Sequence, residues 1–498
     1  MIALLPVTAV AQALTSLTSL WVRYNTRKNT VKPEGELKAQ LASLDREVAE
    51  ATRLGQSSES RRLLAKGMTL LDGKPWTDVA DFGASLVVRT DRVIIDSGKP
   101  GSFRIEQIYR PTIELTRALS GRVSLRPFPA VANTTMIKAL GTFEGVGRDL
   151  RDVPFFFETD LRDVADGVYQ LNVEVMDENR LLGTATLTIA VRKGLDETMG
   201  RLESAAATAS ETVRPDILFP LDRMRSVNRG RLELRTFNLD RDIAAAEAIA
   251  ATVRSGGDPY AGRTGDFKRH YYLDAAQEIM PYRLFVPKAY IGTKAFPLII
   301  PLHGLGGTED VMFDGYGKRM TALAEERGYI VAAPFGYRVD GGYGWGVGSP
   351  PPDAVLRRVQ ELSERDVMEV LRRVQQAYNI DGRRVYLMGH SMGGIGTWKL
   401  AAKYPDVWAA LAPFAGYGAP GTLEGFRHIP EFVVHGDADQ TVPVGGSRAM
   451  VARLKELGAE VLYVEVPGGD HGNVVAPNFP AMFNFFDVHQ KAAARVAK

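Results

Sequence analysis

A serine enclosed by glycines carries the clearest chemical signal in this sequence. Ser391 lies in the segment Gly-His-Ser-Met-Gly-Gly at residues 389–394, and the apolar run 384–388 leads directly into it. Small residues are needed around a serine on a sharp strand-to-helix turn, because bulky neighbours would clash there. We therefore predict that Ser391 is a nucleophile. The alternative is a glycine-rich turn with a passive serine.

A serine hydroxyl needs a base to become nucleophilic, and that base needs an acid to orient it. Of the seven histidines, His428, His435, His471 and His489 follow Ser391. When the chain order is nucleophile, acid, base, the histidine comes last. His428 and His435 precede the candidate acids, and His489 falls on an expected C-terminal helix. The remaining residue, His471, lies in a glycine-rich loop after the last expected strand and is the predicted base.

Two carboxylates compete for the role of orienting acid. Asp437 and Asp439 both follow the apolar run 431–434 and precede His471. We favour Asp439, because Asp437 is closer to the strand end, where it would accept hydrogen bonds from loop amides. The spacing separates them only weakly. Asp470 is too close in sequence to orient the ring of its neighbour.

Acyl transfer also needs two N–H donors for the developing oxyanion. The amide of Met392, directly after the serine, is one candidate. The other is expected in a loop after an earlier strand, and residues 302–307 (Leu-His-Gly-Leu-Gly-Gly) follow the apolar run 297–302. The Leu305 amide is our choice and the Gly304 amide is the alternative. A phosphate-binding loop is excluded here, because no Lys-Ser or Lys-Thr follows.

Three further residues are candidates for a substrate pocket. His303 lies in the loop just described, Trp345 follows the apolar run 329–333, and Tyr417 follows the run 409–413. Aromatic side chains at such positions could form the walls of an acyl or aryl pocket. Packing of Trp345 against the helix after Ser391 is an equally good interpretation. The sequence indicates no cofactor and no metal.

The chemically important residues fall within an alternation of apolar strands and amphipathic helices. From residue 267 onward, strands are expected at 283–286, 297–302, 329–333, 384–388, 409–413, 431–434 and 460–466, with a helix at 364–378. Continuous apolar strands of this kind are buried on both faces, and their alternation with helices predicts a mostly parallel sheet. The predicted fold class is α/β, and the catalytic domain spans residues 261–498.

The N-terminal half has a different texture. Residues 34–75 predict a helical hairpin, residues 78–194 predict an antiparallel β-sandwich of immunoglobulin-like type, and residues 195–260 predict a helical connector. Residues 1–22 carry no charged side chain. Residues 1–10 are mostly apolar, and the small residues within 9–13 could form a cleavage site. We interpret them as the remnant of a signal peptide, with an amphipathic helix as the alternative. A periplasmic or secreted location follows from the first interpretation.

The bulk composition limits the choice of function. The 498 residues carry a formal net charge of +2, which gives no reason to expect a nucleic-acid partner. The chain has no cysteine, so disulfides, thiolate metal sites and a cysteine nucleophile are excluded. No stable membrane span is expected. The N-terminal domains could mediate homo-oligomers.

Residues 267–488 resemble the esterase branch of the α/β-hydrolases, which includes polyhydroxybutyrate-depolymerase-like and feruloyl-esterase-like enzymes and overlaps prolyl-oligopeptidase-type catalytic domains. The matching segments are 280–287, 303–307, 378–386, 389–394, 435–443 and 469–472. The resemblance implies an α/β-hydrolase fold and places the acid on Asp439. An immunoglobulin-like domain before the catalytic domain is also similar to some bacterial esterases.

The leading hypothesis is a carboxylic ester hydrolase that forms an acyl-enzyme on Ser391 and takes a small-molecule or polymeric ester. A serine peptidase of prolyl-oligopeptidase type is the first alternative. It would need a propeller, and the N-terminal half is too short and too varied for one. The second alternative is a non-catalytic binding protein, which the intact set of nucleophile, base and acid argues against.

Overall fold

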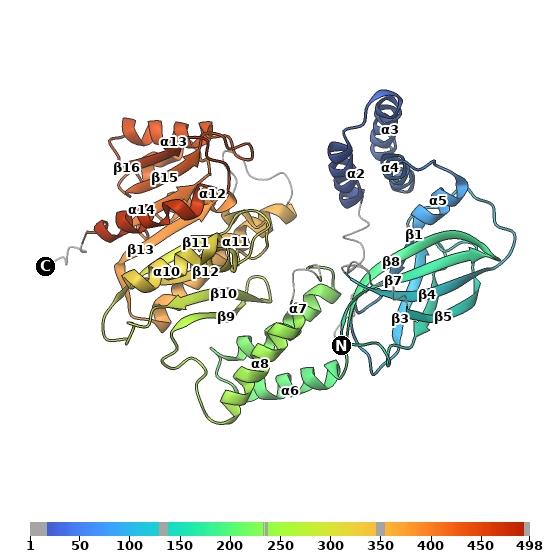
Figure 1. Cartoon of the computed structure of the whole chain (residues 1–498), viewed down its shortest axis with the longest axis horizontal. Helices are drawn as coiled ribbons and strands as arrows, with labels where there is room; N and C mark the ends of the chain where they lie inside the picture. The colour runs from blue at the N-terminus through green and yellow to red at the C-terminus, as the bar shows by residue number, and fades with distance from the viewer. Residues whose placement is uncertain (1–16, 129–137, 233, 235–237, 345–353, 493–498) are drawn as a thin grey trace. The chain divides into compact units, whose positions relative to one another are not determined.

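The computed structural model describes residues 17–128, 138–232, 234, 238–344 and 354–492. The chain forms two compact units, of which the first comprises Met1–Ser204 and Pro220–Ala245 and the second Ala205–Phe219 and Ala246–Lys498. Helices α6 (Leu195–Thr208), α7 (Arg214–Asn228) and α8 (Leu239–Arg254) occupy the expected connector (Figure 1). The boundaries between the two units run through this helical region, so its residues are divided between them.

The first unit begins with helices that form their own apolar core. The helices are α2 (Leu17–Val31), α3 (Gly35–Arg53), α4 (Ser57–Leu71) and, next to the sheets, α5 (Asp78–Ser85). Tyr24 of α2 packs with Leu41 and Leu64. A Cβ at Gly67 would lie 2.5 Å from the Tyr24 ring, so glycine is what allows α2 to approach α4. Helix α2 was not expected beyond residue 22, and residues 1–16 of the predicted signal remnant lie outside the described part.

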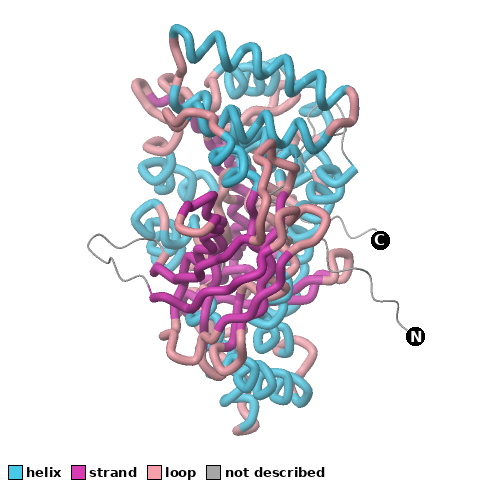
Figure 2. The backbone as a smooth tube through the Cα atoms, turned by 90° about the vertical axis from the view of Figure 1, so that its right-hand side faces the viewer, coloured by secondary structure: helices cyan, strands magenta, loops and turns pink. Residues whose placement is uncertain are grey.

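Two sheets follow these helices in the first unit, and Figure 2 turns their strands toward the viewer. One sheet has the order β1-β3-β6 and the other β2-β8-β7-β4-β5. Apolar side chains of both sheets share one core, which includes Phe103, Val123 and Leu171. A two-sheet arrangement is what a sandwich requires, and its immunoglobulin-like type stays a prediction. The strands are β1 (Leu86–Arg89), β2 (Ile94–Asp96), β3 (Gly101–Gln107), β4 (Leu119–Pro127), β5 (Lys138–Val146), β6 (Phe155–Thr159), β7 (Gly167–Asp177) and β8 (Arg180–Arg192).

The second unit is built on a sheet of eight strands in the order β16-β15-β14-β13-β11-β12-β10-β9. The pairs from β16 through to β12 are parallel, whereas β10 is antiparallel to both β12 and β9. This confirms the predicted α/β class with a mostly parallel sheet. The strands are β9 (Gly265–Leu273), β10 (Glu278–Val286), β11 (Phe296–Leu302), β12 (Ile330–Pro334), β13 (Ile380–His390), β14 (Ala410–Phe414), β15 (Glu431–Gly436) and β16 (Val461–Val466).

Helices cover both faces of this sheet (Figure 1). Successive residues of β11 alternate between two cores: Leu298 and Ile300 pack on one face and Ile299 on the other. Burial on both faces explains why these strands are continuously apolar. One face carries α11 (Ala354–Ala377), α12 (Met392–Lys403) and α13 (Gly445–Glu456), and the other carries α9 (Val311–Asp314), α10 (Arg319–Arg327) and α14 (Val475–Val488).

The strand register brings the carboxyl ends of the central strands together. Leu302 at the end of β11 pairs with Gly389 of β13, and His390 pairs with Phe414 at the end of β14. In parallel α/β sheets, ligand sites lie outside these carboxyl ends. None of the helices in the described ranges is long and apolar enough to cross a membrane.

Candidate active site

Ser391 stands on the turn that joins β13 to α12. Its backbone has φ 58° and ψ −118°, a conformation that is costly for a residue with a side chain. The Ser391 N–H donates to the Phe414 carbonyl at 2.9 Å, which holds the turn against β14. A Cβ at Gly389 would lie 2.2 Å from the Gly393 carbonyl oxygen, and a Cβ at Gly393 would lie 2.2 Å from that of Leu302. Glycine is therefore sterically required on both sides of the serine.

His471 lies in the loop after β16 and is paired with Asp439, from the loop after β15. The two atoms His471 Nδ1 and Asp439 Oδ2 are 2.7 Å apart. The other carboxylate oxygen of Asp439 accepts the N–H groups of Thr441 at 2.8 Å and Val442 at 2.9 Å. Burial acts to raise the pKa of Asp439, but these hydrogen bonds outweigh it and lower the pKa. The carboxylate is thus held ionised and fixed in direction.

The other carboxylates near this pair serve the loops. Asp437 accepts the N–H of Gly468 at 2.6 Å. Asp470 accepts the N–H groups of Gly472 and Asn473. Both side chains therefore stabilise loop backbone, whereas the structure brings Asp439 to the His471 ring.

The structure also brings His471 next to the serine turn. Its backbone carbonyl oxygen lies 2.7 Å from Nε2 of His390, the residue directly before Ser391. The two imidazole rings have centroids 4.8 Å apart. Among the described residues, no hydrogen bond joins the Ser391 hydroxyl to the His471 ring. Such contacts often tighten only when substrate binds.

Two backbone amides of interest lie beside Ser391. Met392 is the first residue of α12, so its N–H has no acceptor within the helix. The Leu305 N–H has no acceptor in the part of the chain that the structure describes. Its neighbour Gly304 lies against the nucleophile, because a Cβ there would be 3.3 Å from the Ser391 Cβ. The loop after β11 is thus adjacent to the serine.

The predicted pocket residues differ in burial and in surroundings. His303 is buried, with Nδ1 2.7 Å from the Gly304 carbonyl oxygen and Nε2 2.8 Å from that of Phe335. These two contacts hold the His303 ring within its loop, and a role for His303 in a substrate pocket stays a prediction. Tyr417 remains partly exposed after β14, and its Cβ faces Gly446 of α13. Trp345 lies outside the described residues.

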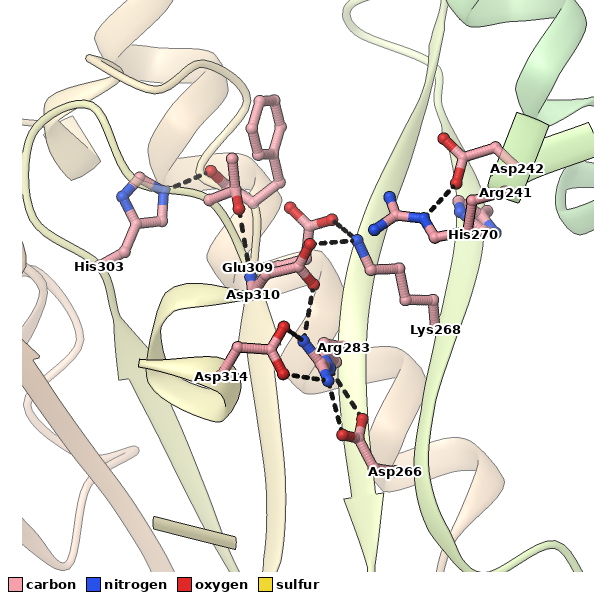
Figure 3. Close-up of polar contacts among 12 residues, drawn as sticks. Arg241, Asp242, Asp266, Lys268, His270, Arg283, His303, Glu309, Asp310 and Asp314 are labelled. Atoms are coloured by element: carbon pink, nitrogen blue, oxygen red, sulfur yellow. Dashed lines mark hydrogen bonds and ion pairs between the residues drawn. The ribbon is translucent and has the colours of Figure 1, made fainter. Parts of the chain in front are cut away.

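An ionic network holds the far end of the loop that carries Leu305 (Figure 3). Lys268 of the edge strand β9 lies 2.7 Å from both the Glu309 and the Asp310 carboxylates. Arg283 of β10 contacts Asp310 at 3.0 Å and also Asp266. Two neighbouring strands therefore anchor residues 309–310, and with them the loop beside Ser391. No local pattern in the sequence predicts this network, since its members come from distant segments.

Tyr316, in the 3₁₀ turn η2 (Tyr316–Lys318), is a further residue that sequence reasoning missed. Its hydroxyl lies 3.0 Å from Nδ1 of His390.

Among the described residues, no group of three or more His, Cys, Asp or Glu side chains could hold a metal ion.

Comparison with known proteins identifies the family. The model of the family described as putative esterase matches residues 274–457. A putative esterase from Nocardia uniformis subsp. tsuyamanensis is 30% identical over 261 residues, which cover 52% of this chain and 67% of that protein. The chain therefore belongs to the esterases, and its mostly parallel α/β sheet agrees with the fold that the resemblance to α/β-hydrolases implies.

Two other relatives are similar over shorter stretches. A bifunctional acetylxylan esterase/xylanase from Neocallimastix patriciarum is 30% identical over 147 residues, or 29% of this chain and 20% of that protein. Feruloyl esterase B from Neurospora crassa is 33% identical over 119 residues, or 24% of this chain and 38% of that protein. The chain thus spans well under half the length of these two relatives.

Proposed function

We propose that this protein hydrolyses carboxylic esters through an acyl-enzyme on Ser391, with His471 as the general base and Asp439 as the orienting acid. The N–H groups of Leu305 and Met392 are the proposed oxyanion donors. The observation that carries the proposal is the contact of 2.7 Å between the His471 ring and the buried Asp439 carboxylate, at the loop edge where the strained Ser391 turn also lies.

The geometry supports a defined division of labour. Asp439 accepts the Nδ1–H of His471, which leaves Nε2 of the neutral ring free to accept a proton. His471 then removes the Ser391 proton as the hydroxyl oxygen attacks the ester carbonyl carbon. The imidazolium returns this proton to the departing alcohol oxygen, and the acyl group stays on Ser391. Water repeats the sequence with the same base and releases the carboxylic acid.

The two amides would act on the charge that develops at the carbonyl oxygen. Backbone N–H groups that need no rearrangement stabilise an oxyanion effectively, since they are already oriented when the charge forms. The Met392 N–H is available to an oxyanion because it lies at the start of α12. The Leu305 N–H is available because it has no acceptor among the described residues.

The proposed substrates are small or polymeric esters. The relatives named above act on acetylxylan or feruloyl esters according to their names, and these acyl groups are the first to test. The Leu305 side chain is 72% exposed beside the proposed nucleophile and supplies an apolar surface for an acyl or aryl group. We assign the reaction to residues 261–498 and propose a periplasmic or secreted location.

A variant with Ser391 replaced by alanine tests the proposal. We expect Ser391→Ala to lose turnover of p-nitrophenyl acetate and methyl ferulate while keeping the wild-type circular dichroism spectrum. A fluorophosphonate probe should label the wild type and not the variant. Turnover or labelling that persists in Ser391→Ala contradicts the proposed nucleophile. A parallel assay with peptidyl p-nitroanilides separates an esterase from a serine peptidase.

A further inference from the structure

The residue before the proposed nucleophile takes part in an ordered chain of hydrogen bonds. His390 is buried at the end of β13, with Nε2 2.7 Å from the carbonyl oxygen of His471 and Nδ1 3.0 Å from the hydroxyl of Tyr316. A carbonyl oxygen can only accept, so Nε2 of His390 must carry a hydrogen. In this first hydrogen bond His390 is therefore the donor and the His471 carbonyl is the acceptor.

The direction of the second link follows from the charge of the ring. Burial lowers the pKa of His390 to about 4, so the ring is neutral near neutral pH. A neutral imidazole carries one N–H, and here that hydrogen is on Nε2. Nδ1 must then accept, and the Tyr316 hydroxyl donates to it. The His471 carbonyl thus selects the tautomer of His390, and the Tyr316 hydroxyl stabilises that tautomer by donating to its otherwise unpaired Nδ1.

The backbone that presents Tyr316 is itself strained. Tyr316, Gly317 and Lys318 all have φ between 52° and 64°, in the left-handed region. For residues with a side chain this conformation is costly, because Cβ approaches the following carbonyl oxygen. Strain of this kind persists where surrounding contacts over-determine it, and it often marks a functional site.

Two ring contacts hold Tyr316 in place. Its ring meets Phe479 of α14 edge-on, with centroids 5.8 Å apart, and meets the His390 ring edge-on at 6.1 Å. The side chain is therefore positioned between α14 and the residue that precedes Ser391.

We infer that Tyr316 and His390 are positioning residues that hold the backbone of the base while Asp439 holds its ring. This inference rests on the proposed function of His471. The loop after β16 is then fixed at two points, Nδ1 of His471 through Asp439 and its carbonyl oxygen through His390. Movement of either point would turn the His471 ring away from Ser391.

A double-mutant cycle tests whether Tyr316 acts through His390. Tyr316→Phe removes the donor to Nδ1 and should lower kcat about fivefold with KM unchanged, the size expected for one hydrogen bond. In His390→Gln the amide nitrogen can donate to the His471 carbonyl whatever Tyr316 does. Tyr316→Phe should therefore change kcat less than about twofold in that background. An equal loss in both backgrounds overturns the inference.

Tyr404→Phe is the matched control, since it removes a hydroxyl that donates to Glu364 at 2.6 Å at the far end of α12. It should leave kcat at the wild-type value, and a loss equal to that of Tyr316→Phe contradicts the inference.

Nitrogen-15 NMR of the imidazoles provides a readout that does not depend on turnover. The His390 signals, assigned by their loss in His390→Gln, should show a protonated Nε2 in both proteins. In Tyr316→Phe the Nδ1 resonance should shift downfield, because Nδ1 no longer accepts a hydrogen bond. An unchanged Nδ1 resonance in Tyr316→Phe overturns the inference. Full turnover by Ser391→Ala would instead refute the proposed function. The NMR result would still report on the contact between Tyr316 and His390, so the two failures are distinguishable.

Discussion

Nδ1 of His471 lies 2.7 Å from Oδ2 of Asp439, although 32 positions of sequence separate the two residues. Asp437, only two residues before Asp439, accepts the N–H of Gly468 instead. The same loop thus holds two carboxylates with different tasks. This difference provides a matched pair of variants.

Asp439→Asn should lower kcat by on the order of 10³- to 10⁴-fold, because the amide no longer fixes the Nδ1–H tautomer of His471. Asp437→Asn weakens the contact to Gly468 and removes a charge near Arg448, neither of which involves His471. Its kcat should stay within about threefold of the wild type, the range of one weakened hydrogen bond. Steady-state kinetics on p-nitrophenyl acetate compares the two. The opposite ranking would make Asp437 the orienting acid.

Leu305→Pro should lower kcat by about 10²- to 10³-fold, because proline removes one N–H from the proposed oxyanion hole. Leu305→Ala keeps that N–H and removes only an exposed side chain, so its kcat on an acetyl ester should stay close to the wild type. Thermal unfolding of both variants shows whether the loop remains folded. Equal activity of a folded Leu305→Pro variant and the wild type would point to another donor, with Gly304 the next candidate.

Lys268→Met should reduce the free energy of unfolding by about 1–3 kcal/mol, because it removes the ammonium group that lies 2.7 Å from the carboxylates of both the buried Glu309 and Asp310. The loop beside Ser391 would lose an anchor, and kcat should fall as well. The control is Arg372→Met on α11, which breaks an exposed ion pair to Glu369 worth less than about 1 kcal/mol. Urea unfolding and kinetics are measured on both, and an equal loss of stability would count against the anchoring role.

Glu431→Gln should remove a pH dependence of stability. Burial raises the pKa of Glu431 to about 8, against about 4.3 for an unfolded glutamate. Between these values the folded chain retains a proton that the unfolded chain has lost. Stability therefore falls as pH rises from about 4.3 to about 8, and below this window the contribution is fully present.

The glutamine stays neutral and can still accept the Trp398 N–H that Glu431 accepts at 2.7 Å. Urea-unfolding midpoints at several pH values from 5 to about 8 measure the slope, which covers most of that window. Glu456→Gln, at an exposed site on α13, should keep the wild-type slope. A wild-type slope in Glu431→Gln would show that another group causes it.

Local patterns in the sequence were sufficient for several features. The strand-to-helix turn at Ser391 was predicted from the glycines around it, because the steric demand of such a turn acts on neighbouring residues. The continuous apolar strands correctly predicted a mostly parallel sheet, because burial on both faces leaves a direct trace in residue type. The predicted boundaries were less accurate. Helix α11 begins at Ala354 rather than near residue 364, since the apolar pattern that predicts a helix does not extend over its exposed first turns.

Contacts between distant segments were decided by the tertiary structure. The choice between Asp437 and Asp439 depends on where the loop after β16 lies, and two residues of identical type carry no record of that. The contact between the His303 ring and the Phe335 carbonyl joins residues 32 positions apart, so the sequence did not predict it. Tyr316 and His390 are 74 positions apart. The sequence by itself determined which residue types stand at the strand ends, because local sterics and burial act along the chain. Only the packing of the strands decided which of those side chains meet.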